Sequence, residues 1–319
     1  MYSRIIGTGK YLPERVLTNL DLEMTMDTTA EWIQTRTGIE QRHIAADGET
    51  TSDLAYHASI AAMDMAGVDP QEIDMIVVGT CTPDLVFPNV ACLIQQRLGI
   101  SGGPAFSVEA ACSGFMYAFT TADQFMRTGS IQRALVVGAE TMSRIVDWTD
   151  RETCVLFGDG AGAIVIEAAE EPGVIYSSLG ADGKYKNLLY ADAGISKKSS
   201  APDTSLIRMK GSEVFKVAVR TLESMVDQVI EENNIKQGEI DWFVPHQANL
   251  RIIKATAKRL QIPMERVILT VAEHGNTSAA SVPMALDTAV RDGRIKHGDL
   301  LLLEAFGGGF TWGASLVRY

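Results

Sequence analysis

Several features that would narrow the function of a protein are missing from this sequence of 319 residues. It has no apolar run approaching about 18 residues, so we expect no transmembrane helix and no membrane partner. Its four cysteines form no CxxC pair and no metal-ligand spacing, which indicates reduced thiols in a cytoplasmic protein and argues against a metal site. The net charge of −12 argues against a nucleic-acid partner.

The composition is that of a globular protein, with 46% hydrophobic and 21% charged residues. The chain is too long for one typical core, so two halves are expected. Strand-like segments alternate with helical ones, which predicts parallel βαβ units. Two glycine-rich segments do not have the spacing of a phosphate or dinucleotide loop. We expect residues 7–13 to form a structural turn, whereas residues 158–163 lead into a strand.

Short segments recur in the same order along the chain. Residues 73–79 resemble 240–246, residues 97–100 resemble 259–262, and residues 127–137 resemble 291–303. Three such pairs favour a duplication and predict two similar α/β halves, residues 1–171 and 172–319. The last pair has an offset of 164 residues, from Arg127 to Arg291, and this offset carries Cys112 onto Asn276.

Cys112 lies where a run of small residues meets a helical pattern over residues 113–126. The first turn of a helix has free N–H groups and the positive end of the helix dipole. A thiol there can have its pKa lowered from about 8.5 to about 3.5–7.5, which would make it a nucleophile. A buried structural cysteine is the alternative, and this segment alone leaves both interpretations open.

Other polar groups follow strands of the predicted second half. His246 comes at the end of one strand, and three glycines at 307–309 follow another. Glycines there would let backbone N–H groups approach a substrate, as in an oxyanion hole. His246 alone could be structural, and Asn276 alone could be a helix cap. Because ligands bind at the carboxyl ends of strands in such sheets, we expect these groups and Cys112 to converge.

Two further patterns concern charged side chains. Trp32 and Arg36 share one face of a short predicted helix, as a nucleotide platform or as a surface packing pair. Between residues 247 and 264 four basic residues occur without an acidic one: Arg251, Lys254, Lys258 and Arg259. This segment is either a docking surface for an acidic partner or an ordinary solvated helix face. A basic cluster in an acidic chain favours docking.

Three motifs together carry a resemblance to a known family: Ala-Ala-Cys-Ser-Gly-Phe at 110–115, Val-Pro-His-Gln-Ala-Asn at 244–249 and His-Gly-Asn-Thr-Ser at 274–278. The chain resembles the β-ketoacyl-acyl carrier protein synthase III family of the thiolase-like superfamily, from residues 5–9 to residues 310–313. The resemblance implies a homodimer and an α/β thiolase-like fold. In that fold, duplicated βαβ-rich halves form a five-layered αβαβα sandwich.

The resemblance also implies a reaction, the condensation that starts type II fatty acid synthesis. Cys112 would attack acetyl-CoA and carry the acetyl group, while the N–H groups of Cys112 and Gly308 hold the oxyanion. His246 and Asn276 would then act on malonyl-acyl carrier protein, whose decarboxylation supplies the carbon nucleophile. No cofactor or metal is implied, since acetyl-CoA is a substrate.

Binding contacts are implied as well. The CoA-binding residues would be Trp32, Arg36, Arg151 and Asn249. The carrier protein would contact Gln247, Ala248, Asn249, Leu250, Arg251, Lys254, Lys258 and Arg259. Phe87 would lie near the acyl pocket and the dimer partner, where a bulky side chain suits a short acyl primer.

Alternatives remain within and outside this superfamily. A thiolase would need a second cysteine near the C-terminal glycines, and residues 304–310 contain none. The elongating synthases have a second histidine where Asn276 stands. A long-chain or polyketide-type initiating synthase, a Cys-His-Asn hydrolase and a non-enzymatic carrier-binding module are the other hypotheses.

Overall fold

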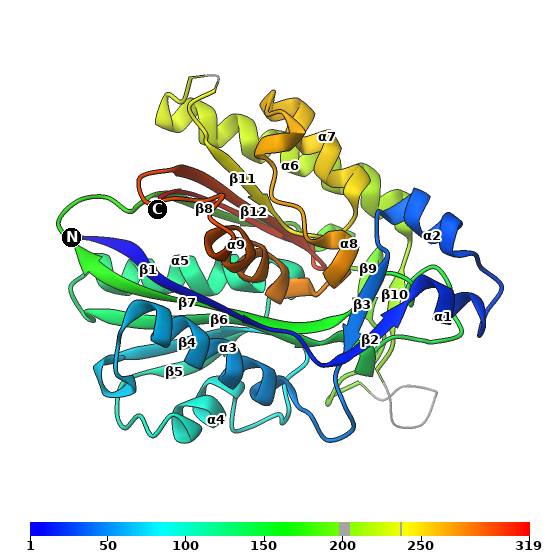
Figure 1. The fold of residues 1–319 in the computed structure, drawn as a ribbon, viewed down its shortest axis with the longest axis horizontal. Coiled ribbons are helices and arrows are strands. Elements are labelled where there is room, and N and C mark those ends of the chain that lie inside the picture. Colours follow the sequence, from blue (N-terminus) through cyan, green and yellow to red (C-terminus); the bar gives the residue numbers. More distant parts are fainter. Residues whose placement is uncertain (198–204, 237) are drawn as a thin grey trace.

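The computed structural model describes residues 1–197, 205–236 and 238–319. Most of the polar segment 196–204, for which the sequence suggests a surface loop, lies outside this description. Two sheets and three helical layers alternate in the order α/β/α/β/α (Figure 1). The five-layered sandwich predicted from the sequence is therefore confirmed. Within the described residues, no helix is long and apolar enough to cross a membrane.

The first sheet has five strands in the order β1-β7-β6-β4-β5. They are β1 (Tyr2–Tyr11), β4 (Met75–Gly79), β5 (Ala105–Val108), β6 (Arg133–Thr141) and β7 (Asp159–Ala169). β4 pairs in parallel with β5 and β6, whereas β7 is antiparallel to both of its neighbours. The predicted parallel βαβ units are therefore present at β4, β5 and β6, whereas β1 and β7 add antiparallel pairings that the sequence did not predict.

The second sheet has four strands in the order β11-β12-β13-β8. They are β8 (Val174–Ala181), β11 (Trp242–Pro245), β12 (Leu300–Gly307) and β13 (Thr311–Arg318). The two sheets share one strand order. The strands of the second sheet correspond to four strands of the first: β8 to β1, β11 to β4, β12 to β6 and β13 to β7. Every strand of the first sheet lies before residue 171 and every strand of the second lies after it. The division into halves at this boundary stays our proposal.

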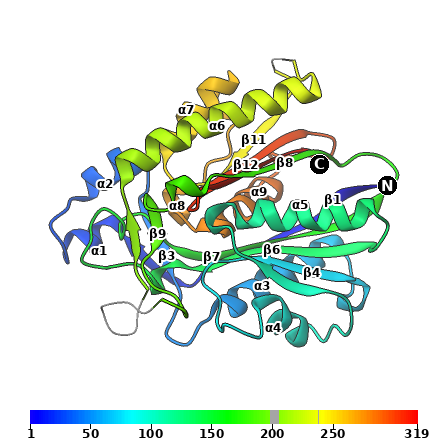
Figure 2. The same cartoon turned by 180° about the vertical axis from the view of Figure 1, so that it is seen from behind.

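Helices cover both sheets and fill the space between them (Figure 2). The central layer holds α5 (Gly114–Arg127) and α9 (Ser281–Arg291), which contact both sheets. α3 (Thr51–Ala66) and α4 (Val90–Arg97) cover the outer face of the first sheet, while α6 (Gly211–Asn233) and α7 (Leu250–Leu260) cover the second. The central helices are buried because apolar side chains face a sheet on two sides, such as Phe115, Phe119 and Leu286.

Shorter elements surround the ends of the sheets. They include β2 (Arg15–Thr18), α1 (Asn19–Glu23), α2 (Ala30–Thr37), β3 (Gln41–Ile44), β9 (Leu189–Ala191), β10 (Ile207–Met209) and α8 (Val271–His274). The 3₁₀ turns are η1 (Pro70–Glu72), η2 (Ala111–Ser113), η3 (Met142–Arg144), η4 (Gly183–Tyr185), η5 (Met264–Arg266) and η6 (Ser278–Ala280). η2 and η6 lead into the two central helices, and they pack against each other.

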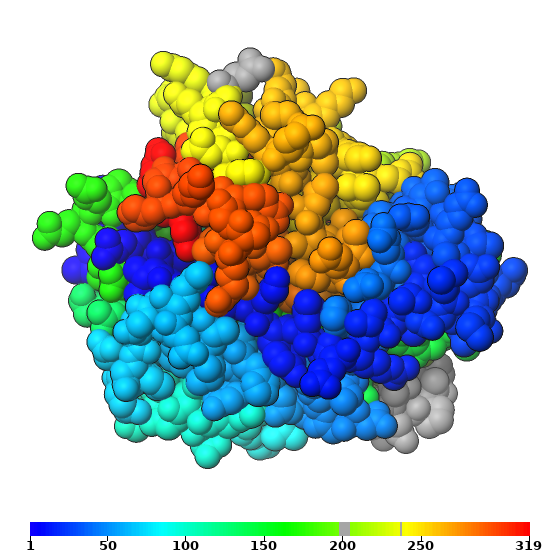
Figure 3. Space-filling model, viewed as in Figure 1, coloured from blue at the N-terminus to red at the C-terminus, as the bar shows by residue number. Residues whose placement is uncertain are grey.

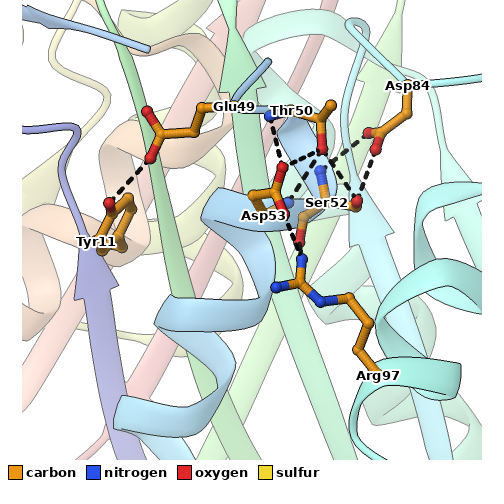
Figure 4. A network of polar contacts seen from close by, with 7 residues as sticks. All are labelled: Tyr11, Glu49, Thr50, Ser52, Asp53, Asp84 and Arg97. Carbon is orange, nitrogen blue, oxygen red and sulfur yellow. Dashed lines mark hydrogen bonds and ion pairs between the residues drawn. The ribbon is translucent and has the colours of Figure 1, made fainter. Parts of the chain in front are cut away.

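The start of α3 illustrates how local sequence defines an element. Thr50 and Asp53 form a capping box, in which each side chain accepts a hydrogen bond from the other residue's backbone N–H. Asp53 also pairs with Arg97 at 2.6 Å, and Asp84 accepts hydrogen bonds from Ser52 (Figure 4). These contacts tie the first turn of α3 to α4 and to the loop after β4.

Residues 7–13 do not form the predicted turn, because β1 continues through Gly7 and Gly9 to Tyr11. A Cβ atom on Gly9 would lie 2.4 Å from the backbone oxygen of Ala58. The glycines are required because α3 approaches the strand too closely for a side chain. A close helix–strand contact therefore explains a pattern that resembled a turn.

The repeat is real in the fold, but its register changes at the central helices. α5 and α9 end at Arg127 and Arg291, which preserves the offset of 164 residues seen in the sequence. α9 is shorter than α5, so the turns that precede the two helices, η6 and η2, are offset by more than 164 residues. The first residue of η2, Ala111, corresponds to the first residue of η6, Ser278, and both have a positive φ. The predicted equivalence of Cys112 and Asn276 is therefore wrong, since Asn276 lies before its turn and Cys112 lies within its own.

Candidate active site

One cavity of about 840 Å³ brings together residues from both halves of the chain. Cys112, His246 and Asn276 line it together with Phe306, and each of the first three is at least nine-tenths buried. Trp32, Arg36 and Arg151 line the same cavity and are exposed or half-buried. The cavity thus extends from the surface to a buried cluster of three polar side chains.

Cys112 is the middle residue of η2, directly before α5. Ala111 has a φ of 45°, so the chain turns sharply before the thiol. Gly79 allows the start of α5 to approach β4, because a Cβ there would lie 2.4 Å from the Gly114 carbonyl carbon. The predicted position of Cys112 at a helix start is confirmed.

The sequence left the pKa of Cys112 open, because a helix start lowers the pKa of a thiol and burial raises it. Burial raises the pKa of the thiol to about 12, a hydrogen bond with Ser278 offsets part of that rise, and Glu140 adds to it. Desolvation of the thiolate therefore outweighs the helix terminus. The resting side chain is a thiol, and its proton must leave before the sulfur can attack.

His246 follows β11 and is supported from α9. Its Nδ1 atom lies 2.5 Å from Oγ of Ser281, and that oxygen also accepts a hydrogen bond from the Gln247 N–H. Burial lowers the pKa of His246 to about 3, so the imidazole is neutral at physiological pH. Sequence patterns did not identify Ser281, because its role depends on how α9 packs beside β11.

Asn276 is held by the segment that precedes β7. Its backbone N–H donates to the Leu156 carbonyl, and its own carbonyl accepts from the Gly158 N–H. Its Oδ1 accepts a hydrogen bond from the Ser278 N–H at 2.9 Å, which leaves the amide NH₂ group as the donor. Asn276 is therefore held by a turn of its own and by the other half of the chain.

The glycines after β12 lie against the nucleophile. A Cβ on Gly307 would be 2.6 Å from the Cys112 backbone nitrogen, so only glycine permits this approach. The Thr311 hydroxyl donates to the Ala110 carbonyl at 2.9 Å and further ties this end of the second sheet to η2. These contacts bring the Gly308 segment next to Cys112, as predicted from the strand-end pattern.

At the cavity mouth, the Trp32 ring is within cation–π distance of both predicted arginines. The guanidinium carbons of Arg36 and Arg151 lie 5.2 and 5.0 Å from the Trp32 ring centroid. Asn249 caps α7 and donates to the Arg36 carbonyl, which links α7 to α2. Glu152, which follows Arg151 in the sequence, also lines this cavity and adds a carboxylate to its lining.

Sequence reasoning did not identify the wall that the start of α6 contributes. Lys210, Phe215 and Lys216 line the cavity there, and the Arg251 guanidinium lies 5.3 Å from the Phe215 ring centroid. No motif marks these residues, because the contact depends on two outer helices packing side by side.

The basic residues of α7 are exposed, but they are not equivalent. Arg259 forms a two-pronged ion pair with Asp227 of α6, whose two oxygens accept from Nε and Nη2. In the part of the chain that the structure describes, Arg251, Lys254 and Lys258 form no ion pair. Three rather than four positive charges of α7 are therefore free of an ion pair among the described residues. α7 lies beside α2 on the surface (Figure 3).

One predicted contact residue, Gln247, needs correction, and three others stay predictions. Gln247 is fully buried, and its side chain bonds to the backbone of Pro245, Ile268, Thr270 and Val271, so it cannot reach a carrier protein. Phe87 is 84% exposed and does not line the cavity of its own chain, so its predicted place near the acyl pocket and the dimer partner stays a prediction. Ala248 and Leu250 are half-buried at the start of α7 and stay predictions.

Comparisons with known proteins agree with this architecture. Residues 106–183 match the family model described as 3-oxoacyl-[acyl-carrier-protein (ACP)] synthase III, and residues 230–319 match the model of its C-terminal part. A β-ketoacyl-[acyl-carrier-protein] synthase III from Thioalkalivibrio sulfidiphilus is 61% identical over 100% of this chain and 99% of the relative. The chain belongs to the β-ketoacyl-acyl carrier protein synthase III family.

Solved structures of this family superpose closely. The synthase III from Aquifex aeolicus has a TM-score of 0.94 and 48% identity, covering 99% of this chain and 100% of that one. A priming β-ketosynthase from the R1128 polyketide pathway has a TM-score of 0.94 and 37% identity, covering 99% of this chain and 96% of that one. The synthase III family has the thiolase fold, so the predicted fold class is confirmed.

Proposed function

We propose that this synthase III chain condenses acetyl-CoA with malonyl-acyl carrier protein to form acetoacetyl-acyl carrier protein, CoA and CO₂. The observation that carries this proposal is the single cavity in which Cys112, His246 and Asn276 converge below a mouth with Trp32 and two arginines. Such a cavity suits a nucleotide-bearing thioester whose reactive end lies deep and whose charged end stays near the surface.

In the first half-reaction, Cys112 attacks the acetyl thioester and takes the acetyl group. The oxygen of the tetrahedral intermediate would accept hydrogen bonds from the N–H groups of Cys112 and Gly308. One such donor can contribute roughly 2.7–4 kcal/mol of transition-state stabilisation. Trp32 would stack on the adenine ring, while Arg36 and Arg151 would bind phosphates and Asn249 would contact CoA.

In the second half-reaction, malonyl-acyl carrier protein loses CO₂ and its carbanion attacks the acetyl-cysteine. His246 and Asn276 would donate hydrogen bonds to the thioester oxygen, where enolate charge develops. Support comes from Ser281, because a hydroxyl that donates to Nδ1 leaves the imidazole proton on Nε2. Decarboxylation supplies the electron pair, so this step needs no base for a carbon acid.

The carrier protein would dock on α7 through Arg251, Lys254 and Lys258, with Ala248, Asn249 and Leu250 beside the cavity. The free positive charges of α7 support this site, since they lie on a chain with a net charge of −12. Arg259 would contribute less, because Asp227 already neutralises it.

A homodimer in the cytoplasm is part of the same proposal. Phe87 is 84% exposed, and the adjacent Val86 and Leu85 are 64% and 51% exposed. A partner chain that covered this apolar loop would remove it from water and bring Phe87 near an acyl pocket. The four free cysteines fit a reducing compartment.

The decisive test is incubation with acetyl-CoA followed by intact mass measurement. We expect one acetyl adduct that maps to Cys112 and is absent in Cys112→Ala. Added malonyl-acyl carrier protein should consume the adduct and release CO₂. Hydrolysis of the adduct at the same rate without malonyl-acyl carrier protein would instead indicate a hydrolase.

A second candidate is a synthase that starts from a larger primer, which the likeness to the polyketide priming enzyme favours. A panel of acyl-CoA primers separates the two functions. Efficient acylation by acetyl-CoA supports our proposal, whereas activity restricted to octanoyl-CoA or other long primers supports the second candidate.

A further inference from the structure

The two backbone N–H groups proposed for the oxyanion hole lie in segments that need support from outside. Ala111, directly before Cys112, has a φ of 45°, which is an unfavourable conformation for a residue with a side chain. Gly308 is the middle one of three consecutive glycines, which leave the backbone many conformations. An oxyanion hole works only if its donors are oriented before charge develops. The contacts around these two segments therefore bear on catalysis.

The side chain of Thr311 reaches both segments. Its Oγ1 atom lies 2.9 Å from the carbonyl oxygen of Ala110 and 3.2 Å from that of Gly308. The Ser113 hydroxyl donates to Oγ1 of Thr311 at 2.8 Å and also lies 2.8 Å from the Ala110 carbonyl oxygen. One hydroxyl group is therefore within hydrogen-bond distance of the turn that carries Cys112 and of the glycine segment that follows β12.

Two hydroxyl protons serve two carbonyl groups in this arrangement. A hydroxyl group donates one hydrogen bond and can accept two. The Thr311 hydroxyl therefore divides its proton between the carbonyls of Ala110 and Gly308, and the Ser113 hydroxyl donates to Thr311 or to Ala110. The Ser113 N–H also donates to the Ala110 carbonyl at 3.1 Å. We call the side chains of Thr311 and Ser113 the hydroxyl pair.

The bonded carbonyls are close along the backbone to the proposed N–H donors. Gly308 carries its N–H and its carbonyl on the two peptide planes that meet at its Cα atom. Only Ala111 separates the carbonyl of Ala110 from the N–H of Cys112. Because peptide groups are planar, a carbonyl that is fixed in direction limits the rotation available to a neighbouring N–H. The hydroxyl pair thus restrains both proposed donors.

Regular elements of both halves of the chain hold the hydroxyl pair. Thr311 is the first residue of β13 and pairs with Gly307 of β12 and Ala181 of β8. Ser113 is 0% exposed at the end of η2, which leads into α5. Hydrogen bonds in such low-dielectric surroundings are stronger than in water. The pair therefore connects the second sheet firmly to the turn of the nucleophile.

We propose that the Thr311 hydroxyl, supported by Ser113, positions the N–H groups of Cys112 and Gly308 for the oxyanion. The inference rests on the proposed acyl-transfer function. Thr311 is a positioning residue, because it acts through these N–H groups and does not line the substrate cavity. No motif in the sequence marks it, since its contact with η2 depends on the packing of the two halves.

The step that depends on this positioning is addition to the acetyl carbonyl. In acetyl transfer a bond forms between Sγ of Cys112 and the acetyl carbon, and a carbonyl electron pair moves to the oxygen. The carbonyl then re-forms and the bond from carbon to the CoA sulfur breaks. The Cys112 thiol has exchanged its proton for acetyl, and CoA leaves as its thiol. In condensation the carbanion adds to the same carbon, the bond to Sγ breaks, and the Cys112 thiolate takes a proton from solvent. Thr311 therefore acts in both half-reactions.

Rapid-quench measurement of Cys112 acetylation over a range of acetyl-CoA concentrations tests the positioning role. Thr311→Val replaces the hydroxyl with a methyl group of similar size. We expect the maximal acetylation rate to fall roughly 10–10²-fold, because displaced donors weaken the oxyanion hole. The half-saturating acetyl-CoA concentration should change less than about twofold, since the oxyanion forms only after binding. Thr311→Ser, which keeps the hydroxyl, should restore most of the rate.

Ser315→Ala is the matched control. Ser315 is a buried hydroxyl residue of the same strand, and its Oγ lies 2.8 Å from Oγ of Ser177 on β8. The substitution removes a hydroxyl–hydroxyl contact from β13 and leaves the contacts with η2 in place, so acetylation should stay at the wild-type rate. Equal slowing in Thr311→Val and Ser315→Ala, or no recovery in Thr311→Ser, would overturn the positioning role.

Ser113→Ala decides the question if Thr311→Val does not fold. It removes the supporting donor, so acetylation should slow roughly threefold to tenfold at an unchanged half-saturating concentration. A wild-type rate in this variant, or in a folded Thr311→Val, means that the hydroxyl pair does not position the donors. If the wild-type chain itself is not acetylated on Cys112, the proposed function fails. If it is acetylated and both variants match it, only the positioning role fails.

Discussion

Burial sets the protonation states of Cys112 and His246, the two ionisable side chains deep in the cavity of this synthase III. The thiol of Cys112 stays protonated and the imidazole of His246 stays neutral, because both charged forms lose water on burial. A neutral imidazole that is fixed by Ser281 suits hydrogen-bond donation to a developing oxyanion. The charge states of Cys112 and His246 at neutral pH therefore follow from their burial rather than from the ordinary pKa of each side chain.

Replacing His246 or Asn276 by Ala should damage decarboxylation of malonyl-acyl carrier protein more than acetyl transfer. Each side chain is proposed to stabilise enolate charge, which arises only in the second half-reaction. Rates of the two half-reactions, measured separately, check this, and equal losses in both would contradict it.

The low pKa of His246 predicts a specific pH profile. With a pKa of about 3, the imidazole is neutral at every pH well above that value. Decarboxylation by the wild type should therefore show no acid limb from His246 between about pH 5.5 and 8. A loss of decarboxylation centred near the ordinary histidine pKa, with the fold intact, would show that the imidazole titrates normally.

Glu152 should weaken acetyl-CoA binding, because its carboxylate lines the same cavity as Arg36 and Arg151. Glu152→Gln removes the charge at nearly constant size. We expect KM for acetyl-CoA to fall about twofold to fivefold at low salt, with kcat nearly unchanged. Steady-state kinetics at two ionic strengths provide the measurement, and a higher KM would mean that Glu152 assists binding.

At the scale of elements, α7 packs against the core with one face and presents basic side chains to solvent with the other. Ile253, Ala257 and Leu260 are buried against the second sheet and α6, while Arg251, Lys254 and Lys258 face solvent. The amphipathic pattern fixes which face is buried. The ion pair between Arg259 and Asp227 then removes one charge from the exposed face.

This difference between arginines predicts different effects on carrier-protein docking. Arg251→Gln should raise KM for malonyl-acyl carrier protein about threefold to tenfold and leave Cys112 acetylation largely unaffected. Arg259→Gln is the matched control on the same helix and should change KM less. Kinetics at low and high salt test the pair, and equal effects of the two substitutions would argue against a specific docking face.

At the scale of the whole molecule, the β5 edge of the first sheet lies close to an exposed apolar loop. β5 is one of the two edge strands of this sheet and pairs only with β4 within the described chain. The exposed apolar side chains of Leu85, Val86 and Phe87 follow β4. Unpaired strand edges and exposed apolar loops are typical of surfaces that another chain covers.

Phe87→Asp should therefore weaken self-association and lower condensation activity together. A charge in an apolar contact is costly to bury, so we expect a concentration-dependent shift from dimer to monomer. Sedimentation velocity over a range of protein concentrations measures it. A wild-type chain that is monomeric at micromolar concentrations would contradict the dimer.

The sequence by itself determined the fold class and the doubled α/β architecture, and it singled out Cys112 as the candidate nucleophile. Strand and helix periodicities and a repeat indicate two α/β halves, whereas the thiolase-like fold and the role of Cys112 come from three motifs shared with the family. The same local reasoning wrongly predicted a turn at residues 7–13, where glycines are needed for a close helix–strand contact. Gly7 and Gly9 lie within β1 because α3 presses against it, and no local pattern distinguishes that contact from a turn.

Only the tertiary structure decided the chemistry around the nucleophile. Burial, which the sequence around Cys112 does not reveal, raises the pKa of its thiol, and the shorter α9 moves Asn276 out of register with Cys112. The packing of η2 on η6 brings the turn of Ser278 against the turn of Cys112, and the Ser278 hydroxyl donates a hydrogen bond to Glu140, across more than a hundred residues of sequence. Desolvation and long-range packing depend on the whole fold, so the sequence around Cys112 could not reveal them.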